Sequence, residues 1–388
     1  MAFPLGTLSK AQFLKRYWQK RPLLVRQAFP FFPELVSPDE LAGLSCEESL
    51  VSRIILEKGG AHPWEVRRGP FKASSFKKLP PTHWTLLVNG VDRYVPAVND
   101  LLGVFSFIPN WRIDDVMISY AVKKGNVGAH VDNFDVFLIQ ASGTREWQIE
   151  SKPLLKDAFK PNLDVRLLQK FKPDQRWKLE PGDMLYLPPR VPHHGIAVTD
   201  DCMTYSVGFR APTHAELIDS AATYSLSKLD ETLRYSDPDL TPQHPGEISQ
   251  KSLKRVKQIL ESVRLEGDAL TQWFGQISTT PKDDDVEIPV EPPLRSAALL
   301  KQLNAGAALC RAEGSRVAFA RSTGRGVWLF TNGESLLLPA GALGFAKLLS
   351  EFIELPTEEL LSECKKPAHR QLLLDLVNRG VFYFPGVL

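Results

Sequence analysis

Two stretches of short apolar strands, far apart in the chain, most constrain how this sequence can fold. The first is GNVGAHVDNFDVFLIQASGTREW at residues 125–147, and the second is PGDMLYLPPRVPHHGIAV at residues 181–198. Each contains an apolar run bounded by Gly, Pro, Asn or Ser, which is typical of strands and tight turns in an all-β domain. The polar residues beside these apolar runs indicate the function.

His130 and Asp132 stand one residue apart in the first stretch. In a run that alternates as a strand does, the imidazole and the carboxylate point to one face, where they could bind one ion. His193 in the second stretch supplies a third ligand if the two stretches lie side by side. Two histidines and a carboxylate leave three positions open on Fe(II), for a co-substrate and O2. The set indicates an oxygenase, whereas a lone His-x-Asp is more often a surface turn or a core histidine.

Arg145 follows the apolar strand at residues 136–139 and a Ser-Gly-Thr turn. A guanidinium in this place can bind a carboxylate through two parallel hydrogen bonds. We therefore expect 2-oxoglutarate as the co-substrate, with its 2-oxo acid end on the metal and its far carboxylate on Arg145. The hydroxyl of Ser119 is the predicted second partner of that far carboxylate.

The chain resembles the JmjC-type 2-oxoglutarate oxygenases, and within them the bacterial ribosomal-protein arginine hydroxylases. The segments that carry the resemblance are WQKRPLLVR, WRIDDVMIS, GNVGAHVDNFDVF, GTREW, LEPGDMLYLPPRVPHHG and YSVGFRAP. It covers Leu8 to about Pro212 closely and the remainder more loosely. Two positions depart from the family pattern: Phe134 stands where a tyrosine is usual, and His193-His194 where a single histidine is usual. The family motif assigns the metal to His193, although spacing alone allows either histidine.

The resemblance implies a mostly β catalytic core, a double-stranded β-helix or jelly roll, followed by a helical dimerisation segment and a winged-helix-like domain of α+β class. Short strands and turns at jelly-roll spacing, a capping box at Thr213–Glu216 and the acidic, Pro-rich PKDDDVEIPVEPP agree with this order. The predicted divisions are residues 1–212, 213–280, a linker at 281–293, and 294–388. The family resemblance also implies a homodimer.

Composition limits the classes of partner. The 388 residues contain 43% hydrophobic residues, enough for two or three cores, and carry a net charge of only +2. No global field favours nucleic acid, and the helix LLSEFIEL of the last domain has no basic face. The four cysteines lack C-x-x-C spacing, and no apolar run approaches the ~20 residues of a membrane span. We expect free thiols, no membrane contact and a cytoplasmic location.

The substrate pocket is predicted from the strand period. Asp115, Met117 and Ser119 share one face of a strand, so an apolar slot ending in a carboxylate would lie beside the iron. An arginine side chain suits such a slot, because its guanidinium can stack on a ring and fork onto a carboxylate. The alternative is that Asp115 pairs with an internal arginine such as Arg112. The predicted substrate-binding residues are Asp115, Met117, Phe134 and Ser206.

The leading hypothesis is therefore an Fe(II)- and 2-oxoglutarate-dependent oxygenase. The resemblance implies that it hydroxylates the β-carbon of an arginine in large-subunit ribosomal protein sixteen. The alternative is a non-catalytic metal-binding jelly roll that serves as an assembly or sensor module. Such a module would be expected to lose a metal ligand or Arg145, and the sequence keeps all of them.

Overall fold

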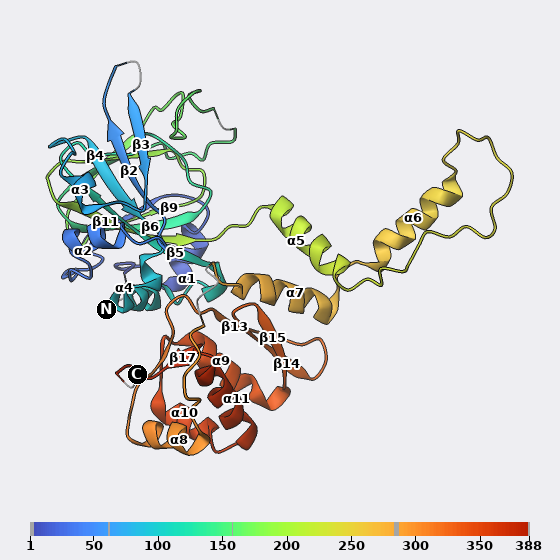
Figure 1. Cartoon of the computed structure of the whole chain (residues 1–388). Helices are drawn as coiled ribbons and strands as arrows, with labels where there is room; N and C mark the ends of the chain where they lie inside the picture. The colour runs from blue at the N-terminus through green and yellow to red at the C-terminus, as the bar shows by residue number, and fades with distance from the viewer. Residues whose placement is uncertain (1–3, 61–62, 157, 283–286, 387–388) are drawn as a thin grey trace. The chain divides into compact units, whose positions relative to one another are not determined.

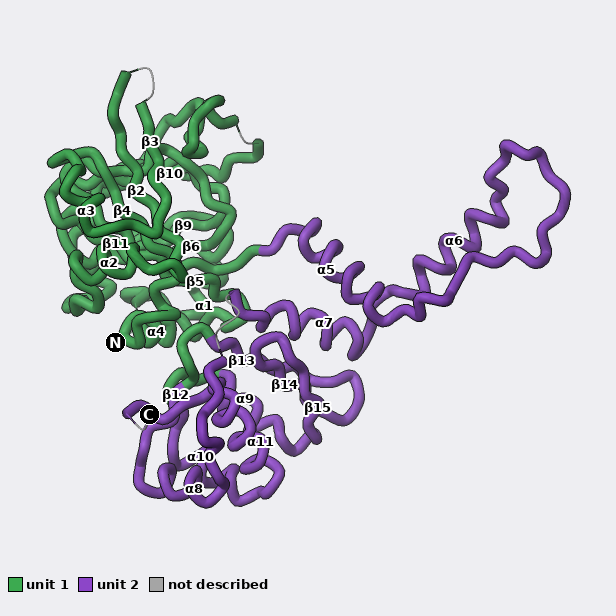
Figure 2. Tube along the Cα trace, viewed as in Figure 1, with its two compact units in different colours: residues 1–211, 311–314, 351–354 green, residues 212–310, 315–350, 355–388 purple. Residues whose placement is uncertain are grey.

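The computed structural model describes residues 4–60, 63–156, 158–282 and 287–386. Its contacts divide the chain into two compact units (Figure 2). Unit 1 contains residues 1–211, 311–314 and 351–354, and unit 2 contains residues 212–310, 315–350 and 355–388. No helix in the described ranges combines the length and the apolar composition that a bilayer span needs.

Unit 1 is built on two antiparallel sheets, which confirms the predicted jelly roll (Figure 1). The large sheet has eight strands in the order β1-β9-β6-β11-β5-β4-β2-β3, and the small one has the order β10-β7-β8. The strands are β1 Leu23–Val25, β2 Ser52–Glu57, β3 Trp64–Arg68, β4 Trp84–Val88, β5 Ile113–Ala121, β6 Asp135–Ser142, β7 Arg145–Ile149, β8 Gln175–Leu179, β9 Met184–Leu187, β10 His193–Ala197 and β11 Cys202–Phe209.

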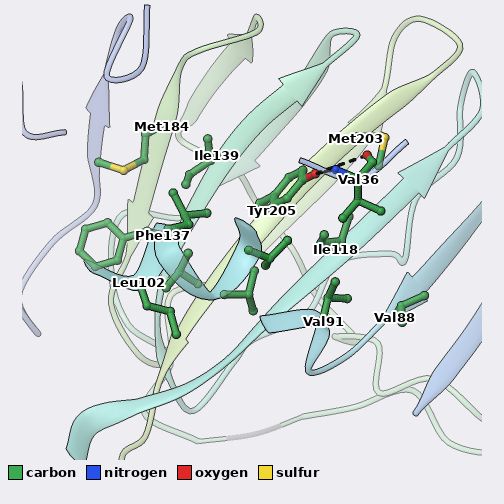
Figure 3. Close-up of a cluster of buried hydrophobic side chains, with 14 of the residues drawn as sticks. Val36, Val88, Val91, Leu102, Ile118, Phe137, Ile139, Met184, Met203 and Tyr205 are labelled. Atoms are coloured by element: carbon green, nitrogen blue, oxygen red, sulfur yellow. Dashed lines mark hydrogen bonds between the residues drawn. The ribbon is translucent and has the colours of Figure 1, made fainter. Parts of the chain in front are cut away.

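Strand β6 is buried on both faces and so separates two cores. Phe137 and Ile139 join a core that also contains Phe13 of the first helix, α1 (Lys10–Arg16). Figure 3 shows both residues near Tyr205 of β11. Leu138 points the other way, into a core shared with the small sheet. Each side chain of this size stabilises the fold by about 1.5–3 kcal/mol when fully buried.

Short helices cover the outer core of unit 1. Ser9 and Ser37 begin α1 and α2 with capping boxes, in which each serine accepts a hydrogen bond from the N3 backbone. Proline stands in the first turn of α2 and α4, where its missing N–H costs nothing. The helices of unit 1 are α1 Lys10–Arg16, α2 Pro38–Leu44, α3 Ala73–Phe76 and α4 Pro96–Leu101, with 3-10 turns η1 Val91–Arg93, η2 Leu102–Phe105 and η3 Asn110–Arg112.

Unit 2 begins with three helices and continues into an α+β domain of winged-helix type. The predicted capping box at Thr213 and Glu216 is present, and the β14–β15 hairpin turns at Asn332-Gly333, both with positive φ as a type I′ turn requires. The elements that follow residue 212, of which β12, α9 and β16 each have one residue in unit 1, are α5 His214–Leu226, α6 Gln250–Ser262, α7 Gly267–Thr279, α8 Ser296–Asn304, β12 Leu309–Arg311, β13 Val317–Arg321, β14 Gly326–Thr331, β15 Glu334–Pro339, η4 Ala340–Ala342, α9 Leu343–Glu351, β16 Glu354–Leu355, α10 Thr357–Glu363, α11 Pro367–Asn378 and β17 Phe382–Tyr383.

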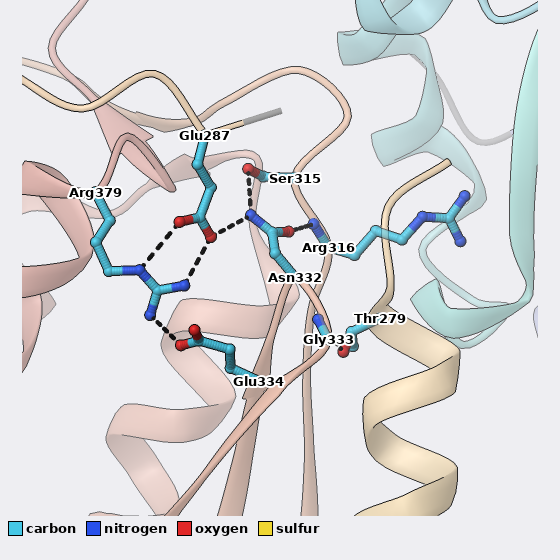
Figure 4. Close-up of polar contacts among 8 residues, drawn as sticks. All are labelled: Thr279, Glu287, Ser315, Arg316, Asn332, Gly333, Glu334 and Arg379. Carbon is cyan, nitrogen blue, oxygen red and sulfur yellow. Dashed lines mark hydrogen bonds and ion pairs between the residues drawn. The ribbon is translucent and has the colours of Figure 1, made fainter. Parts of the chain in front are cut away.

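The described end of the predicted linker is bound to the C-terminal domain (Figure 4). Glu287 receives two hydrogen bonds from Arg379, at 2.7 and 3.1 Å, and one from Asn332 at 2.9 Å. The Val290 amide donates to the Asn378 carbonyl at 3.0 Å. Residues 283–286 lie outside the described ranges. The division of the chain at residues 212, 280 and 293 stays a prediction.

Gly380 provides a test of this docking. It has φ +83°, and a Cβ there would lie 2.2 Å from the carbonyl oxygen of Ile288. Gly386 is the matched control, because its φ is +76° and nothing lies within 4 Å of its Cβ position. We expect Gly386→Ala to cost at most about 1–2 kcal/mol of unfolding free energy, and Gly380→Ala about 1–3 kcal/mol more. Equal losses in urea unfolding would contradict the docked segment.

Candidate metal centre

The two metal-binding stretches meet through their backbones. His130 and His193 form an isolated antiparallel bridge, and each amide donates to the other's carbonyl at 3.0 Å. The ring centroids are 4.2 Å apart. The alternating strand predicted for the first stretch is wrong at this point, because residues 126–129 and 131–134 have no strand pairing and β6 begins at Asp135. The single bridge is sufficient to place both imidazoles together.

His130, Asp132 and His193 are brought together as predicted. Oδ2 of Asp132 lies 3.9 Å from Nε2 of His130 and 3.4 Å from Nε2 of His193. All three potential ligand atoms lie within 4.8 Å of one another. The Nδ1 atoms donate to the carbonyls of Gly128 and Val191, each at 2.9 Å. These hydrogen bonds fix the tautomer, so both Nε2 lone pairs face the same point.

The side chain of His194 points away from the cluster of His130, Asp132 and His193. Its Nε2 lies 3.1 Å from Oδ1 of Asn126, and Nδ2 of Asn126 donates to Glu57 at 2.8 Å. Consecutive residues of β10 face opposite sides of the sheet, so only one of the doubled histidines can join the cluster. The structure places His193 there.

The charges of the site suit a divalent metal. Burial and the neighbouring His193 lower the pKa of His130 to about 4. Burial raises the pKa of Asp132, but His130, His193 and Arg53 outweigh it, and the pKa lies below its ordinary value. Above about pH 5, the site therefore presents a carboxylate and a neutral imidazole, the forms that bind a metal.

Arg145 on β7 is a buried guanidinium with unused donors. The residue is only 3% exposed, and its Nε and Nη2 have no hydrogen-bond partner among the described residues. Buried donors are almost always satisfied, so an acceptor from a ligand is expected at this position. Ser119 on β5 is also buried, and its hydroxyl is 3.4 Å from the Thr204 carbonyl.

The predicted substrate residues lie in two places. Met117 of β5 pairs in register with Ser206 of β11, and Asp115 lies two residues before Met117 on the same face. Phe134 lies in the loop before β6 and is 41% exposed. Arg112, named above as a possible partner of Asp115, pairs with Asp135, Nη2 to Oδ2, at 3.2 Å.

Sequence reasoning missed Arg53 on β2, whose charge acts on Asp132. It belongs to no metal or co-substrate motif. The one available signal is an arginine inside the strand SRIILE, where apolar residues would be expected.

Comparisons with known proteins agree with this architecture. The family model described as JmjC domain matches residues 100–217, and ROXA-like winged helix matches 260–383. A model of an AraC-like ligand binding domain matches 173–271. The chain is 36% identical over 381 residues to the ribosomal protein uL16 3-hydroxylase of Escherichia coli K12, which covers 98% of this chain and 99% of that protein. It is 34% identical to the probable ribosomal oxygenase of Haemophilus influenzae, over 68% of this chain and 66% of that protein.

Solved structures match over the whole length. The X-ray structure of Escherichia coli YcfD superposes with a TM-score of 0.85 at 34% identity, covering 98% of this chain and 99% of that one. The complex of YcfD, a ribosomal oxygenase, with cobalt and 2-oxoglutarate has a TM-score of 0.84 at the same identity and coverage. The fold, the cluster of metal-binding side chains and these similarities lead to one conclusion. The chain belongs to the JmjC-domain ribosomal oxygenases, a family of 2-oxoglutarate-dependent dioxygenases.

Proposed function

We propose that the protein hydroxylates the β-carbon of an arginine in large-subunit ribosomal protein sixteen, using Fe(II), 2-oxoglutarate and O2. The observation that carries the proposal is the cluster of His130, Asp132 and His193 in the same barrel as the buried, unpartnered donors of Arg145. The relative named ribosomal protein uL16 3-hydroxylase supports the substrate class. Such a reaction would take place where ribosomal proteins are made, in the cytoplasm.

The three side chains would hold the iron on one face. Their donor set, two imidazoles and one carboxylate, is the set used by Fe(II) oxygenases, and the hydrogen bonds of both Nδ1 atoms keep the rings in place. The bound iron and 2-oxoglutarate supply the oxidising chemistry, in which one oxygen atom of O2 enters the product and the other enters succinate. The protein supplies binding and orientation.

Arg145 would hold the far carboxylate of 2-oxoglutarate. In the register of β7 and β10, Ile149 pairs with His193 whereas Arg145 pairs with Ala197, four residues farther along the strand. Four residues of strand span about 13 Å, so the guanidinium begins well away from the metal ligands. Ser119, with a buried hydroxyl on the large sheet, is the proposed second partner.

Asp115, Met117 and Ser206 would receive the substrate side chain, with Phe134 at the entrance. The first three lie on the barrel face of β5 and β11, because Val116 and Ile118 between them belong to the opposite core. A carboxylate beside a thioether and a hydroxyl can bind a guanidinium and pack its methylene groups. A non-catalytic role is not favoured, because the metal cluster and Arg145 are both intact.

Mass spectrometry of ribosomal protein sixteen tests the function. Protein from cells with the active enzyme should carry about 16 daltons, one oxygen atom, on one arginine, and protein from cells with Asp132→Ala should not. Asp115→Asn should slow hydroxylation of the peptide by about 10- to 100-fold, because the charge of the carboxylate and one of its two acceptor oxygens are lost. Asp39→Asn, at an exposed position in the first turn of α2, is the control. An unmodified arginine in both cell lines would reject the proposal.

The doubled histidines test the metal assignment. His193→Ala should weaken cobalt binding by more than about 100-fold, since loss of an outer partner of a ligand already costs 10- to 100-fold. His194→Ala should fall short of that loss, because its ring bonds Asn126. The measurement is a competitive titration against a chelator. A larger effect of His194→Ala would assign the ligand to the other histidine.

We also propose a homodimer formed by the helices of unit 2. On α6, Leu253, Val256 and Leu260 are exposed at helical spacing, and Ile218 is exposed on α5. Apolar stripes of this kind usually bury against a partner. The paired change Leu253→Glu and Leu260→Glu should turn a dimer into a monomer in light scattering. Leu155→Glu, at an exposed site of unit 1, should leave the dimer intact; a monomeric wild-type protein would refute the interface.

A further inference from the structure

Arg53 lies on the barrel face of the large sheet. On the same strand, β2, Ile54 and Leu56 are buried in the core beneath the helices, on the other face of the sheet. Side chains alternate along a strand, so the Arg53 side chain stands on the same side as the metal-binding and co-substrate residues. Removing the charge of an arginine from water in that place costs folding free energy, unless an anion or another hydrogen-bond acceptor binds the guanidinium.

The strand register aligns Arg53 with Ser119. Arg53 pairs with Leu87 of β4, and Leu87 pairs with Ser119 of β5. Directly paired residues project from the same face of an antiparallel sheet. The two side chains therefore stand in one cross-strand row, two strands or about 10 Å apart.

The Arg53 guanidinium has an unused hydrogen-bond donor. Its Nε is buried without a hydrogen-bond acceptor, and no ion pair to it occurs within the part of the chain that the structure describes. Arg67 on the neighbouring strand, in contrast, bonds Glu65 at 2.6 Å. The nearby carboxylate is the metal ligand Asp132: burial and Arg68 lower the pKa of Arg53, and the charge of Asp132 opposes them.

We propose that Arg53 is a second anion-binding residue of the metal centre, which binds the 2-oxo acid end of the co-substrate while Arg145 binds the far carboxylate. This inference rests on the proposed function. Its basis is charge and position. The co-substrate is a dianion with two separated carboxylates, and the barrel holds the buried guanidinium of Arg145 and the half-buried guanidinium of Arg53, each with a buried donor that lacks an acceptor. Arg145 lies on β7 four residues from Ile149, the residue that pairs with His193. The positive charge of Arg53 acts on the carboxylate of Asp132.

This placement predicts opposite effects on the metal and on the anion. A fixed positive charge near the metal repels a divalent cation and attracts a carboxylate. Arg53→Met should therefore bind Co(II) several-fold more tightly in the absence of 2-oxoglutarate. The Co(II)-loaded variant should bind 2-oxoglutarate about 10- to 100-fold more weakly, as expected for loss of a charged hydrogen bond. General damage to the site would weaken both.

Two ligands show which end of the co-substrate Arg53 binds. The affinity of each ligand is measured by calorimetry on Co(II)-loaded protein without O2. 2-Oxoglutarate has both carboxylates, and 2-oxopentanoate lacks only the far one. Arg53→Met should weaken both ligands by a similar factor. Arg145→Met should weaken 2-oxoglutarate alone, because only that ligand has a far carboxylate to lose. Arg53→Lys should recover part of the affinity for both, and Arg67→Met, paired with Glu65 on β3, should change neither.

Each remaining outcome decides the question. Wild-type affinity of Arg53→Met for both oxo acids overturns the proposal, and so does a loss confined to 2-oxoglutarate. Normal binding of both oxo acids with weaker binding of the peptide would assign Arg53 to the substrate instead. If the wild-type Co(II) protein does not bind 2-oxoglutarate at all, the proposed function itself fails, independently of Arg53.

Discussion

The antiparallel bridge between His130 and His193 is the interaction on which the site depends. Two reciprocal backbone hydrogen bonds join loops that are far apart in the chain, and strand β10 then pairs with β7 from the same point onward. The backbone therefore sets the distance between the two rings before any metal binds. Carbonyls of Gly128 and Val191 complete the arrangement by fixing which nitrogen of each ring is available.

The large sheet separates structural from chemical residues by its two-residue period. On β5, Val116 and Ile118 enter the core beneath the helices, while Asp115, Met117 and Ser119 face the barrel. Burial of the face beneath the helices stabilises the fold. The barrel face can therefore hold polar groups, although burying them costs stability. Buried donors without partners, such as those of Arg145, lie where a ligand is expected to satisfy them.

The C-terminal domain is held by a different kind of contact. Glu287, Arg379 and Asn332 join a segment that precedes the domain to its last helix and to the β14–β15 turn. Half-buried ion pairs of this type add little to the stability of the fold. The backbone hydrogen bond at Val290 and the close approach of Ile288 to Gly380 define where the segment binds. An acidic, Pro-rich composition alone indicated an extended linker, because composition does not reveal a partner surface.

The sequence by itself determined the strand at residues 136–139, the capping box at Thr213 and Glu216, and His130, Asp132 and Arg145 as candidate ligands of the metal and the co-substrate, since local propensity and motif spacing encode them. The tertiary structure decided which residues share a face across strands. It separated His193 from His194 through the direction of β10, and it replaced a predicted strand around His130 with one bridge. It also brought Arg53 into the row of Ser119, because strand register between distant segments depends on packing of the whole barrel and not on any local pattern.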